Sequence, residues 1–224
     1  MFNFRLGQIL TDEFNDLSLT YDLLQTCGKY ELNPFMENFV ADNFFPDKCL
    51  WRKVVKQTIE IHEENKWKLA VGRRPELARY AKIQKCLTEH RLLRLAVAYP
   101  YLNMQFVTLV KLGSMAIKTG QCSLCKLYTT DVLKHYILSC AYLLQIRTEM
   151  FYKIVDILSV EESVCYFNQD DDETVEALLG GLTSAIETFD ADVWSCLMCH
   201  TADYMFKLYQ VFKYDLYSHI FDMN

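Results

Sequence analysis

Glycine, proline and long apolar runs are all scarce in this chain of 224 residues, which has 7 glycines and 4 prolines. The longest uncharged run, residues 95–110, is shorter than the ~20 apolar residues that a membrane-spanning helix needs. No secretion signal is evident, because acidic residues begin at Asp12 and Glu13. No glycine-rich phosphate-binding loop is present either. We therefore expect an intracellular protein of the nucleus or cytoplasm, not secreted, with no membrane and no small-molecule substrate as partner.

Alternation of apolar and polar residues, the mark of a β-strand, is nearly absent, whereas apolar residues recur at helical spacing. The pattern predicts a mainly α fold, a multi-helix domain with one small zinc-knuckle element as its irregular part. Four regions are expected: residues 1–45 as N-terminal helices, 46–119 as a basic helical linker region, 120–158 as the zinc knuckle and following helix, and 159–224 as an acidic C-terminal helical region.

Four local features are expected along the chain. A long helix from Pro46 to the Gly72 break is predicted by a pattern that runs through Leu50, Val54, Thr58, Ile61 and Leu69. A later helix should begin at a Thr88 cap. Residues 159–173 lose the helical period and predict a loop. The last helix should turn inward Val193, Leu197, Tyr204, Leu208, Val211 and Phe212.

The chain has nine cysteines, and a reducing compartment makes disulfides a poor explanation for them. Metal ligation, catalysis and simple burial remain. Four cysteines stand alone among apolar or helical residues and are predicted to be small buried hydrophobes. These are Cys27, Cys49, Cys86 and Cys165.

The remaining pattern of interest is Cys122-x2-Cys125-x9-His135-x4-Cys140. Two residues between cysteines let both sulfurs reach one face of a tetrahedral ion, with Zn–S near ~2.3 Å. Thr129 or Thr130 can cap a short helix that presents His135, and Cys140 can join it if that helix frays. The four residues are predicted to hold one structural Zn²⁺.

Three cysteines and one histidine form a closed set of ligands, whereas a catalytic zinc keeps one position open to water. We therefore expect a structural staple, whose thiolates Lys126 and Lys134 would help to keep charged. The alternative is a helical hairpin with three buried thiols and a hydrogen-bonded histidine.

The formal charge of −6 is unevenly distributed. Residues 48–94 carry 13 basic and 5 acidic side chains, a net +8, whereas residues 149–224 carry 3 and 15, a net −12. A locally positive field with interleaved aromatics is typical of surfaces that contact RNA or DNA. The alternative is a solvated helix face, or neutralisation by the acidic segments. The predicted phosphate contacts are Lys53, Lys56, Arg73, Arg74, Arg79, Lys82, Arg91 and Arg94.

The stretch "CSLCKLYTTDVLKHYILSC", with "ELARYAKIQKCLTEHRLLRLAVAYP" before it, resembles the C-terminal zinc-binding segment of non-LTR (LINE-type) retrotransposon reverse transcriptases. The resemblance covers roughly residues 45–160 and is best at the four metal-ligand candidates. It implies a segment that binds template RNA or target DNA and positions it for the polymerase and endonuclease.

Catalytic activity is not implied by the resemblance. A polymerase needs paired aspartates for two metals, but "FVADN" at 39–43 has Asn43 at the second place, and "QDDDE" at 169–173 has no strand context. Polymerase and endonuclease are both missing, so we expect a detached C-terminal piece of such an element and no enzyme.

Two other cysteine–histidine patterns occur in the chain. "CLMCH", Cys196 to His200, matches a haem-attachment signature, but the compartment and a further axial ligand are lacking, which leaves helix core with a surface histidine as the preferred interpretation. Cys86 with His90 is at ordinary helical spacing, and nothing positions an oxyanion hole for either pair.

The leading hypothesis is a non-catalytic, zinc-stapled nucleic-acid-binding module. The alternatives are a metal-free helical protein-interaction or scaffolding fragment, which binds through its acidic C-terminal half and last helix, and a transposon remnant with no selected function. A homo-oligomer remains open, as do RNA-versus-DNA preference and sequence specificity.

Overall fold

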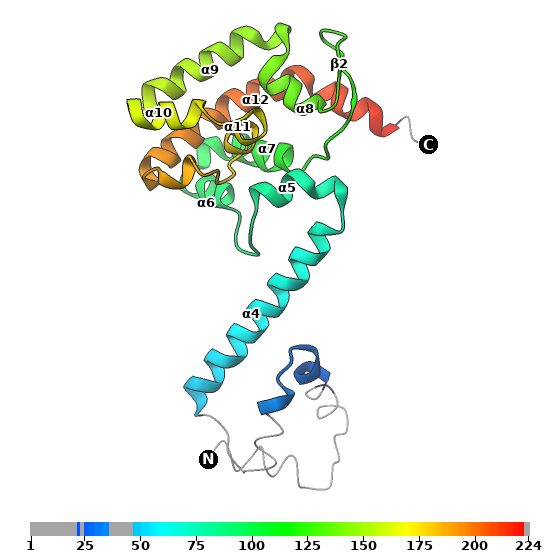
Figure 1. Ribbon diagram of the computed structural model, residues 1–224, viewed down its shortest axis with the longest axis vertical. Coiled ribbons are helices and arrows are strands. Elements are labelled where there is room, and N and C mark those ends of the chain that lie inside the picture. The colour runs from blue at the N-terminus through cyan, green and yellow to red at the C-terminus, as the bar shows by residue number, and fades with distance from the viewer. Residues whose placement is uncertain (1–21, 23–24, 36–46, 222–224) are drawn as a thin grey trace. The chain divides into compact units, whose positions relative to one another are not determined.

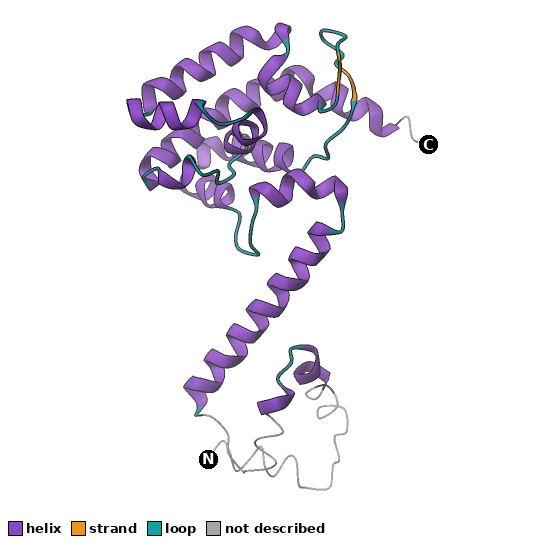
Figure 2. Ribbon diagram, viewed as in Figure 1, coloured by secondary structure: helices purple, strands orange, loops and turns teal. Residues whose placement is uncertain are grey.

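The computed structural model describes residue 22 and residues 25–35 and 47–221, with side chains to residue 213. The chain divides into two compact units, residues 1–69 and 70–224. Helices dominate both, and one short hairpin is the only sheet among the described residues (Figure 2). The expectation of a mainly α, multi-helix fold is confirmed.

The described part of the first unit has a small core, in which Cys27 and Leu32 are buried. Trp51 and Val55 of helix α4 (Lys48–Gly72) pack against them. The long helix is present as predicted, but the apolar positions of its pattern are not core, because Leu50, Ile61 and Leu69 are 48%, 62% and 59% exposed. Ion pairs one turn apart, such as Lys56–Glu60 and Lys68–Glu64, add support along this helix.

The second unit is a helical domain with one hairpin (Figure 1). Its elements, after the end of α4, are η1 (Pro75–Leu77), α5 (Ala78–Ile83), α6 (Arg91–Ala98), η2 (Pro100–Leu102), α7 (Asn103–Gly113), β1 (Gly120–Gln121), β2 (Tyr128–Thr129), α8 (Val132–Lys134), η3 (His135–Ser139), η4 (Ala141–Leu143), α9 (Leu144–Ile157), α10 (Val160–Phe167), α11 (Asp171–Leu178), η5 (Ile186–Thr188) and α12 (Ala191–Phe221).

Helix α12 packs between α7 and α9, and its apolar side forms much of the core (Figure 1). Leu197, Leu208 and Phe212 are completely buried there, as the helical period predicts. Val211 is the exception, since it is 45% exposed and lies beside the buried face. Among the described residues, no helix is sufficiently long and apolar to cross a membrane.

The segment predicted as a loop is helical, which corrects the sequence interpretation. Ser159 and Glu162 form a reciprocal capping box at the start of α10. Asp170 caps α11 by accepting a hydrogen bond from the backbone N–H of Glu173 at 2.8 Å. Helices of eight residues present too few apolar positions for a clear period, which is why pattern reading missed both.

Helix α6 is capped by an unexpected residue. The predicted cap, Thr88, lies in the preceding loop, and the Nδ1 atom of His90 accepts the hydrogen bond from the Leu92 backbone N–H at 3.3 Å. His90 is buried. Burial lowers the pKa of its imidazole, which favours the neutral form that the cap requires.

Candidate metal centre

The first two ligand candidates lie in a tight turn between β1 and β2. The strands are antiparallel, with Gly120 opposite Thr129. The Cys122 backbone N–H donates to the Leu127 carbonyl, and the Lys126 N–H donates to the Cys122 carbonyl, both at 2.8 Å. Lys126 has φ of +64°, so it adopts the left-handed conformation that closes the turn.

The other two candidates are joined by a turn of π-helix, η3. Residues five apart lie roughly 140° apart around a regular α-helix. Here the Cys140 backbone N–H donates to the His135 carbonyl at 2.8 Å, an i→i+5 bond that widens the turn. Cys140 then leaves the helix in an extended conformation. The predicted fraying is therefore an ordered widening of the helix.

Cys122, Cys125, His135 and Cys140 come together, and their ligand atoms all lie within 4.8 Å of one another. The Cys122 and Cys140 sulfurs are 3.8 Å apart, and two sulfurs bound to tetrahedral zinc are about 3.8 Å apart. Cys125 Sγ and His135 Nε2 are 3.1 Å apart, somewhat closer than the about 3.6 Å of a zinc-bound pair. The four residues can hold a metal ion, and no second such group occurs in the described part of the chain.

The ligands differ in how readily they ionise. Burial acts to raise the pKa of the Cys122 thiol, but hydrogen bonds from the backbone and side chain of Cys125, the backbone of Leu124 and the Cys140 thiol together lower that pKa. Burial raises the pKa of Cys140 to about 11. Burial and the nearby Arg147 charge lower the pKa of His135, which favours the neutral imidazole that a metal needs. A dication would overcome the cost of ionising Cys140.

The centre is tied to the rest of the domain at three points. Asp131, which caps α8 in place of the predicted Thr129 or Thr130, forms a buried ion pair with Arg79 of α5. Lys134 pairs with Asp172 of α11 at 2.8 Å. Tyr136 stacks on Phe212 of α12, with ring centroids 4.6 Å apart.

Arg147 is a neighbour of the centre that sequence reasoning missed. Its side chain is 9% exposed and donates a hydrogen bond to the Cys140 carbonyl at 3.1 Å. No carboxylate pairs with it among the described residues. Only its position on α9, seven residues or about two helical turns after Cys140, could have suggested the contact from sequence. A buried cation without an acidic partner is costly unless some other negative charge lies close by.

The eight predicted phosphate contacts differ in burial and in whether a carboxylate pairs with them. Arg79 is buried, bonded to Asp131 and to the Met115 carbonyl, so the prediction that it contacts phosphate is corrected. Lys82 pairs with Glu176 at 2.8 Å, Lys56 with Glu60 at 3.8 Å, and Arg94 weakly with Glu89 at 4.0 Å.

Four of the eight keep their charge without a carboxylate partner among the described residues. Lys53 is exposed on α4, and Arg73 and Arg74 are exposed between α4 and η1. Arg91 is exposed on α6, with its guanidinium 5.4 Å from the ring centre of Trp194. These four are the members of the predicted set whose charge is not offset by a carboxylate within the described residues.

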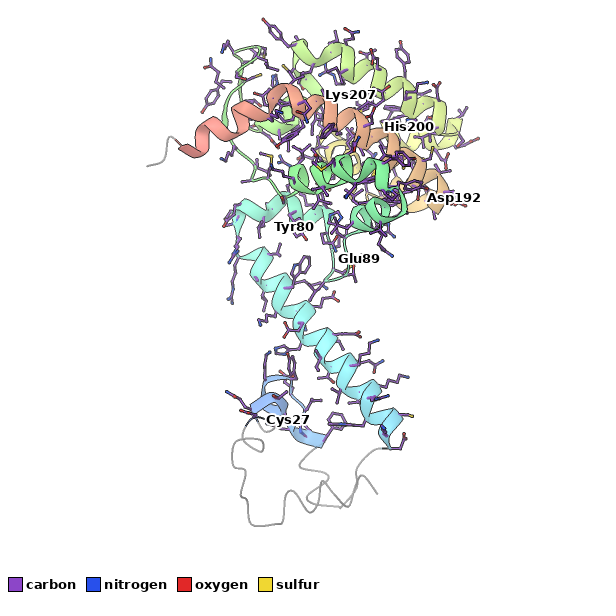
Figure 3. All side chains as sticks on the ribbon, turned by 180° about the vertical axis from the view of Figure 1, so that it is seen from behind. Cys27, Tyr80, Glu89, Asp192, His200 and Lys207 are labelled. Carbon is purple, nitrogen blue, oxygen red and sulfur yellow. The ribbon has the colours of Figure 1, made fainter. Side chains whose placement is uncertain are left out.

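The remaining cysteine and acidic patterns have structural explanations. Cys27 is buried as predicted and Cys86 is half-buried, whereas Cys49 and Cys165 are exposed, which corrects the prediction for those two. Cys196 is exposed on α12. His200 is exposed on the same helix (Figure 3). "QDDDE" starts helix α11, and "FVADN" lies outside the described residues.

Comparisons with known proteins identify no relative of this chain. No protein-family model matches it, and neither a curated protein nor a solved structure is matched.

Proposed function

We propose that this chain is a non-catalytic, zinc-stapled helical module that binds RNA or DNA. The observation that carries the proposal is the Cys₃His cluster, because its four protein ligands fill a tetrahedral zinc and leave no position for a reactive water. Three thiolates favour zinc over harder ions such as magnesium or calcium. Such a site functions as a staple within a nucleus or cytoplasm that keeps free thiols reduced.

Exposed cations beside the knuckle (residues 120–140) support the nucleic-acid part. Lys118 and Lys126 flank and close the hairpin, both are exposed, and neither has a carboxylate partner in the described part of the chain. Tyr128 on β2 is 76% exposed, which leaves its ring free to stack on a base. Arg73 and Arg74 lie a few residues before Arg79, which bonds to Asp131 in the knuckle.

The resemblance to the zinc-binding segment of LINE-type reverse transcriptases supports the same proposal. That resemblance rests on the spacing of Cys122, Cys125, His135 and Cys140. The ordered turns that bring these residues together are consistent with it. The chain would then contribute binding and positioning of a nucleic acid, with polymerase chemistry supplied elsewhere.

A protein-interaction surface is the second candidate function, favoured by one observation. Leu93 and Val97 of α6 and Met104 and Val107 of α7 are 39%, 78%, 65% and 43% exposed, and Tyr101 between them is 75% exposed. Exposed apolar side chains along two paired helices are typical of a covered surface. The described part of α12 is mostly core, so this face is a better candidate than the last helix.

The test is binding of labelled single-stranded RNA and duplex DNA, followed by fluorescence anisotropy at increasing salt. With four phosphate contacts on a single strand, affinity should fall about 50-fold between 50 and 200 mM salt. Replacing Lys118 and Lys126 by serine should weaken binding. The slope of log affinity against log salt concentration should become about 1.4 less steep. Lys153→Ser/Lys213→Ser removes the same charge from α9 and α12 and is the matched control.

Binding that is absent or insensitive to salt would contradict the proposal. A stable homodimer that does not bind nucleic acid and that dissociates when Val97 is replaced by aspartate would favour the protein-interaction function.

A further inference from the structure

A cavity of about 410 Å³ opens between α6, the segment around η5 and the start of α12. Its walls are mainly apolar, with Leu95, Leu182, Ile186 and Phe189 among the lining side chains. The volume lies in the range of about 300–1,000 Å³ that small-ligand sites occupy. It shares no residue with the metal centre.

Two arginines border this cavity from one face of α6. Arg91 and Arg94 are three residues apart, so their side chains project from the same side of the helix. The Arg91 guanidinium lies over the indole of Trp194, 5.4 Å from its centre. Stacking of this kind holds a guanidinium in place and leaves its N–H donors for an anion. Arg91 has no carboxylate partner among the described residues.

The charges around the cavity restrict the ligand. Glu187 lines it and lies 3.5 Å from Lys85, which also bonds to the Leu182 carbonyl. Asp190 and Asp192 flank the first residue of α12. Glu89 precedes α6, and Figure 3 labels both Glu89 and Asp192. These carboxylates would repel a polyanionic strand or a phosphate dianion. A ligand with one compact negative charge next to Arg91 and an apolar body suits both the charges around the cavity and its apolar walls.

We propose that this cavity binds a monocarboxylate with an apolar, preferably aromatic, body. The carboxylate accepts paired hydrogen bonds from Arg91, since guanidinium and carboxylate match in geometry. The body packs against Leu95, Ile186 and Phe189. The carboxylate belongs either to a free small acid or to the last residue of a peptide. The ligand is bound and not converted, and the site stands independently of nucleic-acid binding.

The test uses 3-phenylpropionate as probe, titrated into the full-length protein while the three indole N–H resonances are followed by NMR. Trp194→Phe assigns the resonance of Trp194. We expect that resonance to shift saturably, while those of Trp51 and Trp67 stay in place. Arg91→Met should weaken binding about tenfold or more, because a charge-assisted bidentate contact is lost. Arg73→Met, an exposed arginine away from the cavity, is the matched control.

Neutral and doubly charged analogues complete the design. 3-Phenylpropanamide should bind at least tenfold more weakly than the acid, and phenyl phosphate should also bind more weakly. Equal affinity for acid and amide, tighter binding of phenyl phosphate, or no saturable shift of the Trp194 resonance would overturn the proposal. A peptide that ends in phenylalanine with a free carboxylate, compared with its amidated form, distinguishes the two sources. If the free-carboxylate peptide binds more tightly than both its amide and 3-phenylpropionate, the site is assigned to a chain terminus. If it binds more weakly than 3-phenylpropionate, the site is assigned to a free small acid.

Discussion

Arg147 is the residue whose position most needs explaining, because it is a buried cation with no acidic partner in the described part of the chain. Zinc with three thiolates and a neutral histidine carries one net negative charge. That complex would be the counter-charge that makes the burial of Arg147 tolerable. Without the metal, the domain would be left with an uncompensated charge.

Arg147→Met should therefore lower zinc affinity about tenfold, in the range found when a group supporting metal ligands is lost. Arg147→Lys keeps the charge and is expected to retain most of that affinity. Competition with a chromogenic zinc chelator measures both. If Arg147→Met leaves zinc affinity unchanged and destabilises the zinc-bound and metal-free forms equally, Arg147 has a packing role alone.

His90 makes stability depend on pH in a direction that follows from its environment. Burial lowers its pKa below the ordinary value, so protonation favours the unfolded chain. Its contribution is complete above about pH 6.5 and is lost as the pH falls through the lowered value. His90→Asn keeps an acceptor for the Leu92 N–H but does not titrate.

Urea denaturation at pH 7.5 and pH 5 measures this effect. Between pH 7.5 and pH 5, the free energy of unfolding should fall more in wild type than in His90→Asn. Other titrating groups, His135 among them, lower the free energy of unfolding of both proteins, and that shared loss cancels in the comparison. An equal loss in the two proteins would show that His90 does not contribute.

At the scale of elements, the widened turn η3 determines whether the metal centre can form. Deleting Ser139 would convert the i→i+5 turn into an ordinary helical one and rotate Cys140 by about 100°. We expect that variant to bind zinc at least 100-fold more weakly than wild type, while Ser139→Ala, which keeps the length, should bind normally. Measuring the zinc affinity of the two variants tests whether the widened turn is required. A deletion variant with normal affinity would show that zinc binding does not depend on the turn.

The sequence predicted the centre better than the elements around it. Spacing predicted which four residues come together as a group that can hold a metal ion, because zinc geometry constrains the gaps between ligands. It could not reveal the π-turn, since a widened turn has no residue signature. It also missed α10 and α11, where short length hides the period, and the solvent exposure of Leu50, Ile61 and Leu69. Arg79 looked like a surface cation because its partner, Asp131, is 52 residues away.

At the scale of the whole molecule, the knuckle connects elements that are far apart in the chain. Its contacts reach α5 through Asp131, α11 through Lys134 and α12 through Tyr136. The binding energy of a structural zinc is part of the folding energy and is on the order of 10 kcal/mol. Chelation should therefore cost helicity throughout residues 70–224, beyond the few residues of the hairpin.

Zinc per chain, measured by elemental analysis of protein purified under reducing, chelator-free conditions, decides whether the Cys₃His cluster is a structural zinc site. The comparison is with Cys122→Ser/Cys125→Ser, and with Cys165→Ser, which removes an exposed thiol remote in sequence from the motif. We expect about one zinc in wild type and in Cys165→Ser, and none in the double variant, with a matching loss of helical circular dichroism. Wild-type protein that is fully folded without zinc would contradict this expectation.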